Sequence, residues 1–72
     1  MNTKKEIYYI LLILNTVAKK HGMFIYEAYE YLRQYKGIEF LLEFYDIEHT
    51  LGTDDVVDDV LAICGNNGGT LV

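Results

Sequence analysis

The sequence predicts an all-α protein, a compact bundle of about four short helices. Apolar residues recur at helical spacing along four segments, and no segment shows the strict alternation of a strand. The chain contains no proline, so glycines mark the expected helix boundaries. A length of 72 residues allows one domain at most. We therefore expect a single helical domain over residues 1–64 and a flexible tail, rich in Gly and Asn, over residues 65–72.

The first helix is expected from about Lys4 to Lys20. Thr3 and Glu6 have the spacing of a capping box, and Gly22 suits the position just after a helix. The apolar stripe comprises Ile7, Ile10, Leu11, Leu14, Val17 and Ala18. The stripe is widened around the cylinder by Tyr8, Tyr9, Leu12 and Ile13. A helix that is apolar nearly all round is either central or half covered by a partner, so a homo-oligomer joined through this helix is one prediction.

Two middle helices are expected over about residues 25–35 and 38–49, with Gly37 ending the first of them. Phe24 stands where a polar cap is usual. The helix over 38–49 has two apolar stripes, which comprise Ile38, Leu41, Leu42 and Tyr45 in one and Phe40, Phe44 and Ile47 in the other. A narrow acidic stripe lies between them, made by Glu39, Glu43 and Asp46. Two apolar faces imply a helix packed on both sides.

The fourth helix, expected from about Asp54 to Ile63, is the most clearly amphipathic segment. Thr53 is placed to cap it, and acids in the first turn suit the positive end of the helix dipole. The buried face is expected to comprise Val56, Val57, Val60, Leu61 and Cys64. The exposed face is expected to comprise Asp54, Asp55, Asp58 and Asp59.

Charge is distributed unevenly along the chain, whose formal net charge is −5. All six basic residues lie before Gly37, together with three acids, whereas the remainder contains eight acids and no Lys or Arg. An acidic half repels phosphate, which disfavours direct binding of nucleic acid. It attracts a basic surface on another protein. The expected partner is therefore a protein with a basic surface.

Composition also disfavours several other classes of protein. Cys64 is the only cysteine, so no internal disulfide can form, and a lone thiol fits a reducing cytosol. The longest apolar run, residues 7–14, is far shorter than the ~20 residues that span a bilayer. We expect a cytoplasmic protein without a membrane segment, a metal or a cofactor. One Cys and two distant His lack metal-ligand spacing, and a calcium loop counted from Asp46 has Leu51 where glycine is needed.

His49 is the most tempting candidate for chemistry. It follows Asp46 by three residues, and a His–Asp pair can act as a general base with its orienting partner. A ligand pocket or a minor enzyme built from Tyr45, Asp46, His49 and Thr50 is the alternative hypothesis. The competing interpretation, which we favour, is that His49 and Thr50 hydrogen-bond the end of their own helix. We therefore assign no catalytic residue and expect a protein that is not an enzyme.

Aromatic side chains add a second component to the expected binding surface. Three tyrosines lie outside the main apolar stripes: Tyr8, Tyr26 and Tyr31. They are either half-buried at the edge of the core or exposed as anchors of an interface. Both interpretations stay open. The predicted partner-binding residues are these three tyrosines and the acids Glu39, Glu43, Asp46, Asp54, Asp55, Asp58 and Asp59.

Five segments carry a resemblance to a known family. They are Ala18-Lys-Lys-His-Gly-Met, Glu27-Ala-Tyr-Glu-Tyr-Leu, Tyr35-Lys-Gly-Ile, Tyr45-Asp-Ile-Glu-His-Thr-Leu-Gly and Val57-Asp-Asp-Val. The chain resembles the small bacterial family called domain of unknown function three-seven-nine-one. Members are short helical proteins, often encoded beside proteins resembling ADP-ribosyltransferases, which implies an antitoxin-like or accessory role. The expected function is a small acidic protein-binding module, either antitoxin-like or a phage-encoded inhibitor of a defence enzyme.

Overall fold

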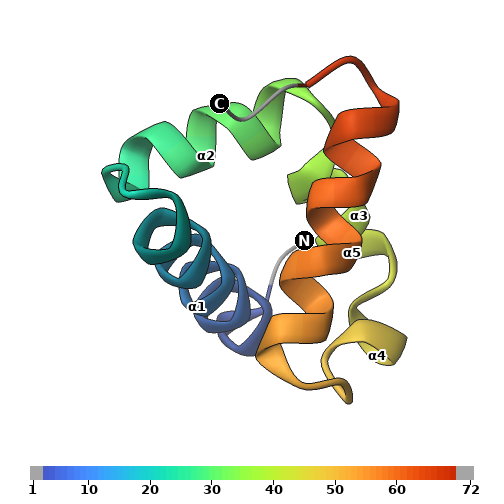
Figure 1. Cartoon of the computed structure of the whole chain (residues 1–72). Helices are drawn as coiled ribbons and strands as arrows, with labels where there is room; N and C mark the ends of the chain where they lie inside the picture. The colour runs from blue at the N-terminus through green and yellow to red at the C-terminus, as the bar shows by residue number, and fades with distance from the viewer. Residues whose placement is uncertain (1–2, 70–72) are drawn as a thin grey trace.

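Five helices make up the regular structure of residues 3–69, the part of the chain that the computed structural model describes (Figure 1). They are α1 (Lys4–His21), α2 (Ile25–Gln34), α3 (Gly37–Glu43), α4 (Tyr45–Glu48) and α5 (Thr53–Asn66). The body measures 30 × 23 × 22 Å along its principal axes. The predicted all-α bundle is confirmed. None of the described helices is both long and apolar enough to cross a membrane.

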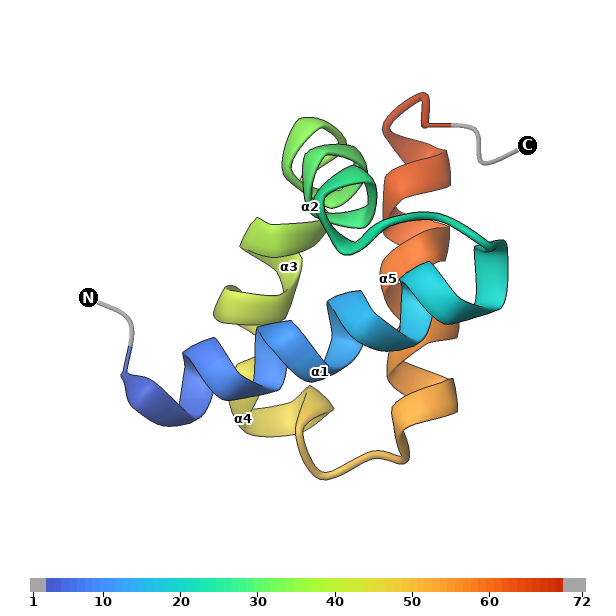
Figure 2. The ribbon, with the colours of Figure 1, turned by 90° about the vertical axis from the view of Figure 1, so that its left-hand side faces the viewer.

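The four longer helices form a closed ring around one core. α1 packs on α2, α2 on α3, α3 on α5 and α5 on α1, and α5 also contacts α2. Figures 1 and 2 show α1, α2, α3 and α5 arranged around a common centre. The core side chains belong to Ile13, Leu14, Val17, Ala18, Ala28, Leu32, Leu41, Val56, Val57, Val60 and Cys64.

Local signals set the ends of α1 as the sequence predicts. Thr3 and Glu6 form the capping box, in which the Glu6 N–H donates to Thr3 Oγ1 at 3.3 Å and the Thr3 N–H to Glu6 Oε1 at 2.8 Å. Gly22 takes a left-handed conformation with φ 62°, which a glycine adopts without strain. At the start of α2, the Glu27 carboxylate accepts from the Phe24 N–H at 2.8 Å, so one half of a capping box survives without a polar cap.

Gly37 does not end the second helix, contrary to the sequence prediction. Lys36 takes the left-handed turn, with φ 71°, and Gly37 begins α3. A Cβ at Gly37 would lie 2.8 Å from Leu32 Cγ and 2.9 Å from Cys64 Sγ. The glycine is therefore present because α2, α3 and α5 meet too closely there for a side chain.

The predicted third helix is not continuous, because the chain bends at Phe44, with φ −104° and ψ 22°. A straight helix over 38–49 cannot place both of its apolar stripes against one core. The bend resolves this conflict by turning Tyr45 toward α1, where its ring packs edge-on against Tyr9 with centroids 5.2 Å apart. Phe44 and Ile47 remain 41% and 63% exposed on the outside of the bend.

The last helix is longer than predicted at both ends. Gly52 is the N-cap and Thr53 the first helical residue, whereas the sequence predicted Thr53 as the cap. Gly65 and Asn66, expected in the tail, belong to α5. The chain then folds back, and the Gly69 N–H donates to the Cys64 carbonyl at 2.9 Å. Gly69 lies against the side chains of Tyr31 and Tyr35, so the end of the described chain packs on α2. The end of the predicted tail, residues 70–72, lies outside the described residues.

Replacing Gly37 by alanine tests this three-helix contact. The added methyl group would clash with two buried side chains, so we expect Gly37→Ala to lower the free energy of unfolding by about 1–3 kcal/mol. Gly65→Ala is the matched control, because a Cβ at this helical glycine meets nothing within 4 Å. We expect the control to raise the free energy of unfolding by up to about 1 kcal/mol. Urea unfolding followed by circular dichroism distinguishes the two, and changes of the same sign would contradict the prediction.

Candidate functional site

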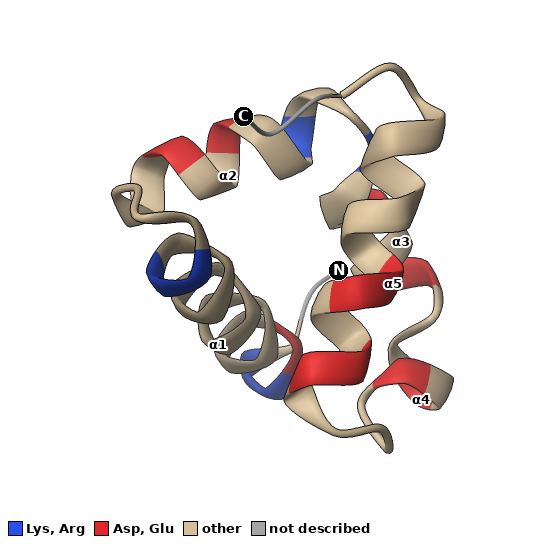
Figure 3. Ribbon diagram, in the orientation of Figure 1, with Lys and Arg blue, Asp and Glu red and all other residues tan. Residues whose placement is uncertain are grey.

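Aspartates gather where α4 leads into α5. The group comprises Asp46, Asp54, Asp55, Asp58 and Asp59, all exposed, and is called here the acidic face. Gly52 caps α5, which places Asp54 and Asp55 in its first turn, where the helix dipole favours negative charge. Figure 3 shows the acidic residues of α4 and of the first half of α5 at the same end of the molecule.

The acidic face has little neutralising charge. The one ion pair that reaches it in the described chain joins Lys20 Nζ to Asp54 Oδ1 at 3.4 Å, with both side chains largely exposed. The two remaining predicted acids lie on α3, where Glu39 is paired with Lys36 at 3.9 Å and Glu43 is exposed. The structure thus gathers five of the seven predicted acids along α4 and α5 and leaves the other two on α3.

Apolar side chains border the acidic face. Phe44, Ile47 and Leu51 are 41%, 63% and 41% exposed on α4 and its flanking residues. The surface therefore combines carboxylates with apolar area, which is the composition of a protein interface rather than of a purely solvated helix.

Glu48 is buried, a feature that the sequence analysis missed. Only 7% of the residue is exposed, and its Oε1 has no hydrogen-bond partner within the described part of the chain. Burial raises the pKa of the Glu48 carboxyl, and hydrogen bonding with Asp59 and the charge of Asp59 act in the same direction. A signal for this was present, since Glu48 continues the stripe of Leu41 and Tyr45 at i+7 and i+3.

Tyr9 shares this buried environment. Its hydroxyl also lacks a hydrogen-bond partner among the described residues. Burial, with the charge of Glu48 as the next contribution, raises the pKa of Tyr9 to about 12. The Tyr9 hydroxyl therefore stays protonated at neutral pH, and it cannot serve there as a base.

His49 and Thr50 have local partners. His49 Nδ1 is hydrogen-bonded to the carbonyl oxygen of Tyr45, and its ring stacks on the Tyr45 ring with centroids 4.5 Å apart. Thr50 Oγ1 donates to the carbonyl of Ile47 at 2.7 Å. Asp46 is exposed, and no hydrogen bond joins it to His49 in the described structure. The geometry favours the capping role over the His–Asp pair.

The three predicted tyrosine anchors lie on α1 and α2 rather than on α4 or α5. Tyr8, on α1, is 67% exposed, and Tyr26, on α2, is 64% exposed and stacks on Phe24. Tyr31 is half-buried, with its ring 5.1 Å from that of Tyr35 and beneath Gly69. Tyr31 therefore matches the packing interpretation, whereas Tyr8 and Tyr26 have the exposure that an anchor needs.

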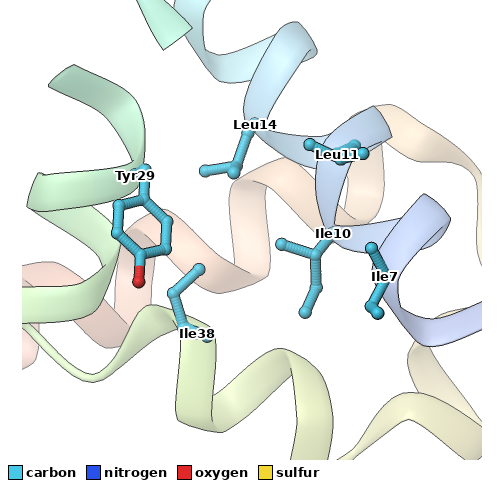
Figure 4. Close-up of a pocket in the computed structure, with 6 residues that line it drawn as sticks. All are labelled: Ile7, Ile10, Leu11, Leu14, Tyr29 and Ile38. Carbon is cyan, nitrogen blue, oxygen red and sulfur yellow. The ribbon is translucent and has the colours of Figure 1, made fainter. Parts of the chain in front are cut away.

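An apolar groove lies on another part of the ring, between α1, α2 and α3. Its volume is about 270 Å³. The side chains that line it, drawn in Figure 4, belong to Ile7, Ile10, Leu11, Leu14, Tyr29 and Ile38. The sequence indicated that the first helix has more apolar surface than one core face needs, but it did not predict a groove, because that requires the positions of three helices.

Sites for metal or thiol chemistry do not emerge from the described residues. No three His, Cys, Asp or Glu side chains there are placed to hold one metal ion. Cys64 is buried, and burial raises the pKa of its thiol, which disfavours the reactive thiolate.

Fold and surface together define a small all-helical protein with an acidic face and an apolar groove. The chain belongs to the family described as "Protein of unknown function (DUF3791)", whose model matches residues 8–67. This match confirms the family resemblance found in the sequence. Neither a curated protein nor a solved structure matches the chain.

The burial of Glu48 predicts how the stability of the fold depends on pH. Because its folded pKa is raised, the folded state loses stability as pH rises through that pKa and the carboxyl ionises. Glu48→Gln removes the charge, so it should raise the free energy of unfolding at pH 7, and the gain should shrink below pH 4.5, the ordinary value for the carboxyl. Denaturant unfolding at several pH values measures this.

The matched control for that measurement is Glu43→Gln, because Glu43 is exposed on the neighbouring helix. Its stability should change by less than about 0.5 kcal/mol at every pH. A Glu48→Gln variant that is less stable at pH 7, or whose effect is independent of pH, would show that the buried carboxylate is not a source of strain.

Proposed function

We propose that this protein is a small binding module that docks its acidic face on a basic site of a partner protein, as an inhibitor or accessory factor. The observation that carries the proposal is the convergence of five exposed aspartates, one of them ion-paired, with three exposed apolar side chains beside them. Carboxylates steer the approach of a basic partner, and apolar contacts hold the docked complex.

The proposed role as an inhibitor or accessory factor rests on the kind of site that the acidic face can occupy. Basic surfaces on enzymes commonly bind nucleic acids or nucleotides, and an acidic module docked there would exclude them. An antitoxin-like protein or a phage-encoded inhibitor of a defence enzyme would act in this way. The engagement of His49 by its own helix supports binding over catalysis as the activity.

Neutralising part of the acidic face should weaken binding. We expect a chain with both Asp55→Asn and Asp58→Asn to bind the partner about tenfold more weakly, or ~1.4 kcal/mol, and with a shallower dependence on salt. The partner is captured from a native extract, purified, and titrated by calorimetry at low and high salt.

The control carries Asn15→Lys and Gln34→Lys, exposed on α1 and α2, and has the same altered net charge of −3, two units above the native −5. The proposal requires the control to keep nearly native affinity. If both double variants bind alike, overall charge rather than the acidic face decides affinity, and the proposal fails.

A further inference from the structure

Residues 45–51, called here the α4 segment, form a short unit whose backbone hydrogen bonds are local. The backbone N–H groups of residues 47–51 all donate to carbonyl groups of residues 44–48. The side chains of His49 and Thr50 also bond to carbonyls of this stretch. Ile47 and Leu51 are 63% and 41% exposed, so they anchor it weakly. Because a single helical turn does not persist alone in water, the segment depends on its remaining contacts with the bundle.

Two side chains attach the α4 segment to the longer helices. The Tyr45 ring packs edge-on against Tyr9 of α1, with centroids 5.2 Å apart. Glu48 is 7% exposed, and its carboxyl group hydrogen-bonds with that of Asp59 on α5. Two carboxylates offer only acceptors, so two carboxyl groups share a hydrogen bond only while one of them is protonated. The attachment through Glu48 therefore requires that this pair retain a proton.

The described surroundings of Glu48 provide no ion-pair partner. Its Oε1 has no hydrogen-bond partner within residues 3–69, and the hydroxyl of neighbouring Tyr9 also lacks one. None of the ion pairs in this part of the chain includes Glu48. The lysine of α1 that reaches α5, Lys20, is paired with Asp54. An ionised Glu48 would therefore have no paired cation to offset its charge.

Negative charge on α5 adds to this effect. Asp55 lies one turn before Asp59, on the same side of the helix. Burial, together with the hydrogen bond and the charge of Asp59, raises the pKa of the Glu48 carboxyl. The other titratable side chains of α3, α4 and the following loop are exposed: Glu39, Glu43, Asp46 and His49. As pH rises and Glu48 ionises, two carboxylates therefore lie side by side.

The chain has a break in regular structure on each side of the α4 segment. Helical structure is interrupted at Phe44, with φ −104° and ψ 22°, and Gly52, with φ −66° and ψ 152°, precedes α5. Figures 1 and 2 show α4 at the periphery of the molecule. Residues at the ends of elements commonly absorb the backbone rotation of a hinge. The segment can therefore move while the four longer helices keep their packing.

We infer that the α4 segment is a pH-operated flap, which packs on α1 and α5 while Glu48 and Asp59 share a proton and detaches when both are ionised. Phe44 and Gly52 are its hinges. Detachment would separate Tyr45 from Tyr9 and displace Asp46 from the rest of the acidic face. The inference does not depend on the proposed function, since it concerns the chain without a partner.

The test is an NMR titration of the native chain. The signal of the Glu48 carboxyl carbon reports ionisation, and the nuclear Overhauser contact between the Tyr9 and Tyr45 rings reports closure. The midpoint for Glu48 should lie above 4.5, its ordinary value. Through that midpoint the ring contact should vanish, and amide protection factors of residues 47–51 should fall at least about tenfold. Protection of the buried residues of α1 and α5 should change less than about threefold.

Three results would overturn the inference. A Glu48 midpoint at or below 4.5 would show that the pair holds no shared proton in the pH range above it. Unchanged protection of residues 47–51 would show that Glu48 ionises without moving the segment. An equal loss of protection throughout the chain would show global unfolding instead of a local flap.

Two matched pairs of variants assign the effect to the carboxyl pair. Glu48→Gln cannot ionise, so its ring contact and protection should persist across the pH range, whereas Glu43→Gln, on α3, should open as the native chain does. Asp59→Asn removes the adjacent charge and should lower the Glu48 midpoint. Asp58→Asn, exposed on the same helix, should shift it by less than half as much. Circular dichroism checks that each variant folds, and equal shifts for the two Asp variants would contradict the assignment.

Discussion

The close contact of Gly37 with Leu32 and Cys64 is the constraint on which the ring of helices depends. At Gly37, on α3, a Cβ would stand within 3 Å of side chains from both α2 and α5. This geometry is strained at Lys36, which takes a left-handed conformation. For a non-glycine residue that conformation is unfavourable by about 1–2 kcal/mol. Gly37 therefore allows the close contact between helices, while Lys36 makes the left-handed turn. With α3 held against both neighbours, α5 can close the ring onto α1.

The core enclosed by these short helices is too small to bury all the large apolar side chains of the sequence. Among residues 3–69, eleven large apolar residues remain exposed, so the outer surface keeps apolar area that the core cannot take. That area is not scattered evenly. Phe44, Ile47 and Leu51 lie beside the acidic face, while Ile7, Leu11 and Tyr29 line the groove. Both candidate surfaces are therefore consequences of the same packing limit.

Sequence reasoning succeeded where the deciding forces are local. Helical periodicity and the Thr3–Glu6 capping box act within a few residues, and they predicted the helix class and the ends of α1. The bend at Phe44 and the burial of Glu48 were missed, because both depend on which of two apolar stripes meets the core. Gly37 was misassigned for a related reason, since a glycine that ends a helix and a glycine at a close approach look alike in a sequence. The exposed aspartates of α5 were predictable from the periodicity of that helix.

The two surfaces also constrain each other through charge. α1 carries the lysines and α4–α5 the aspartates, and Lys20 and Asp54 meet where the two regions adjoin. In so small a body, opposite charges at different faces orient an approaching partner over roughly a Debye length, about 8–10 Å. A basic site on a partner would be drawn to α5 and repelled by the lysines of α1. A uniformly charged polymer such as nucleic acid would be attracted by one face and repelled by the other.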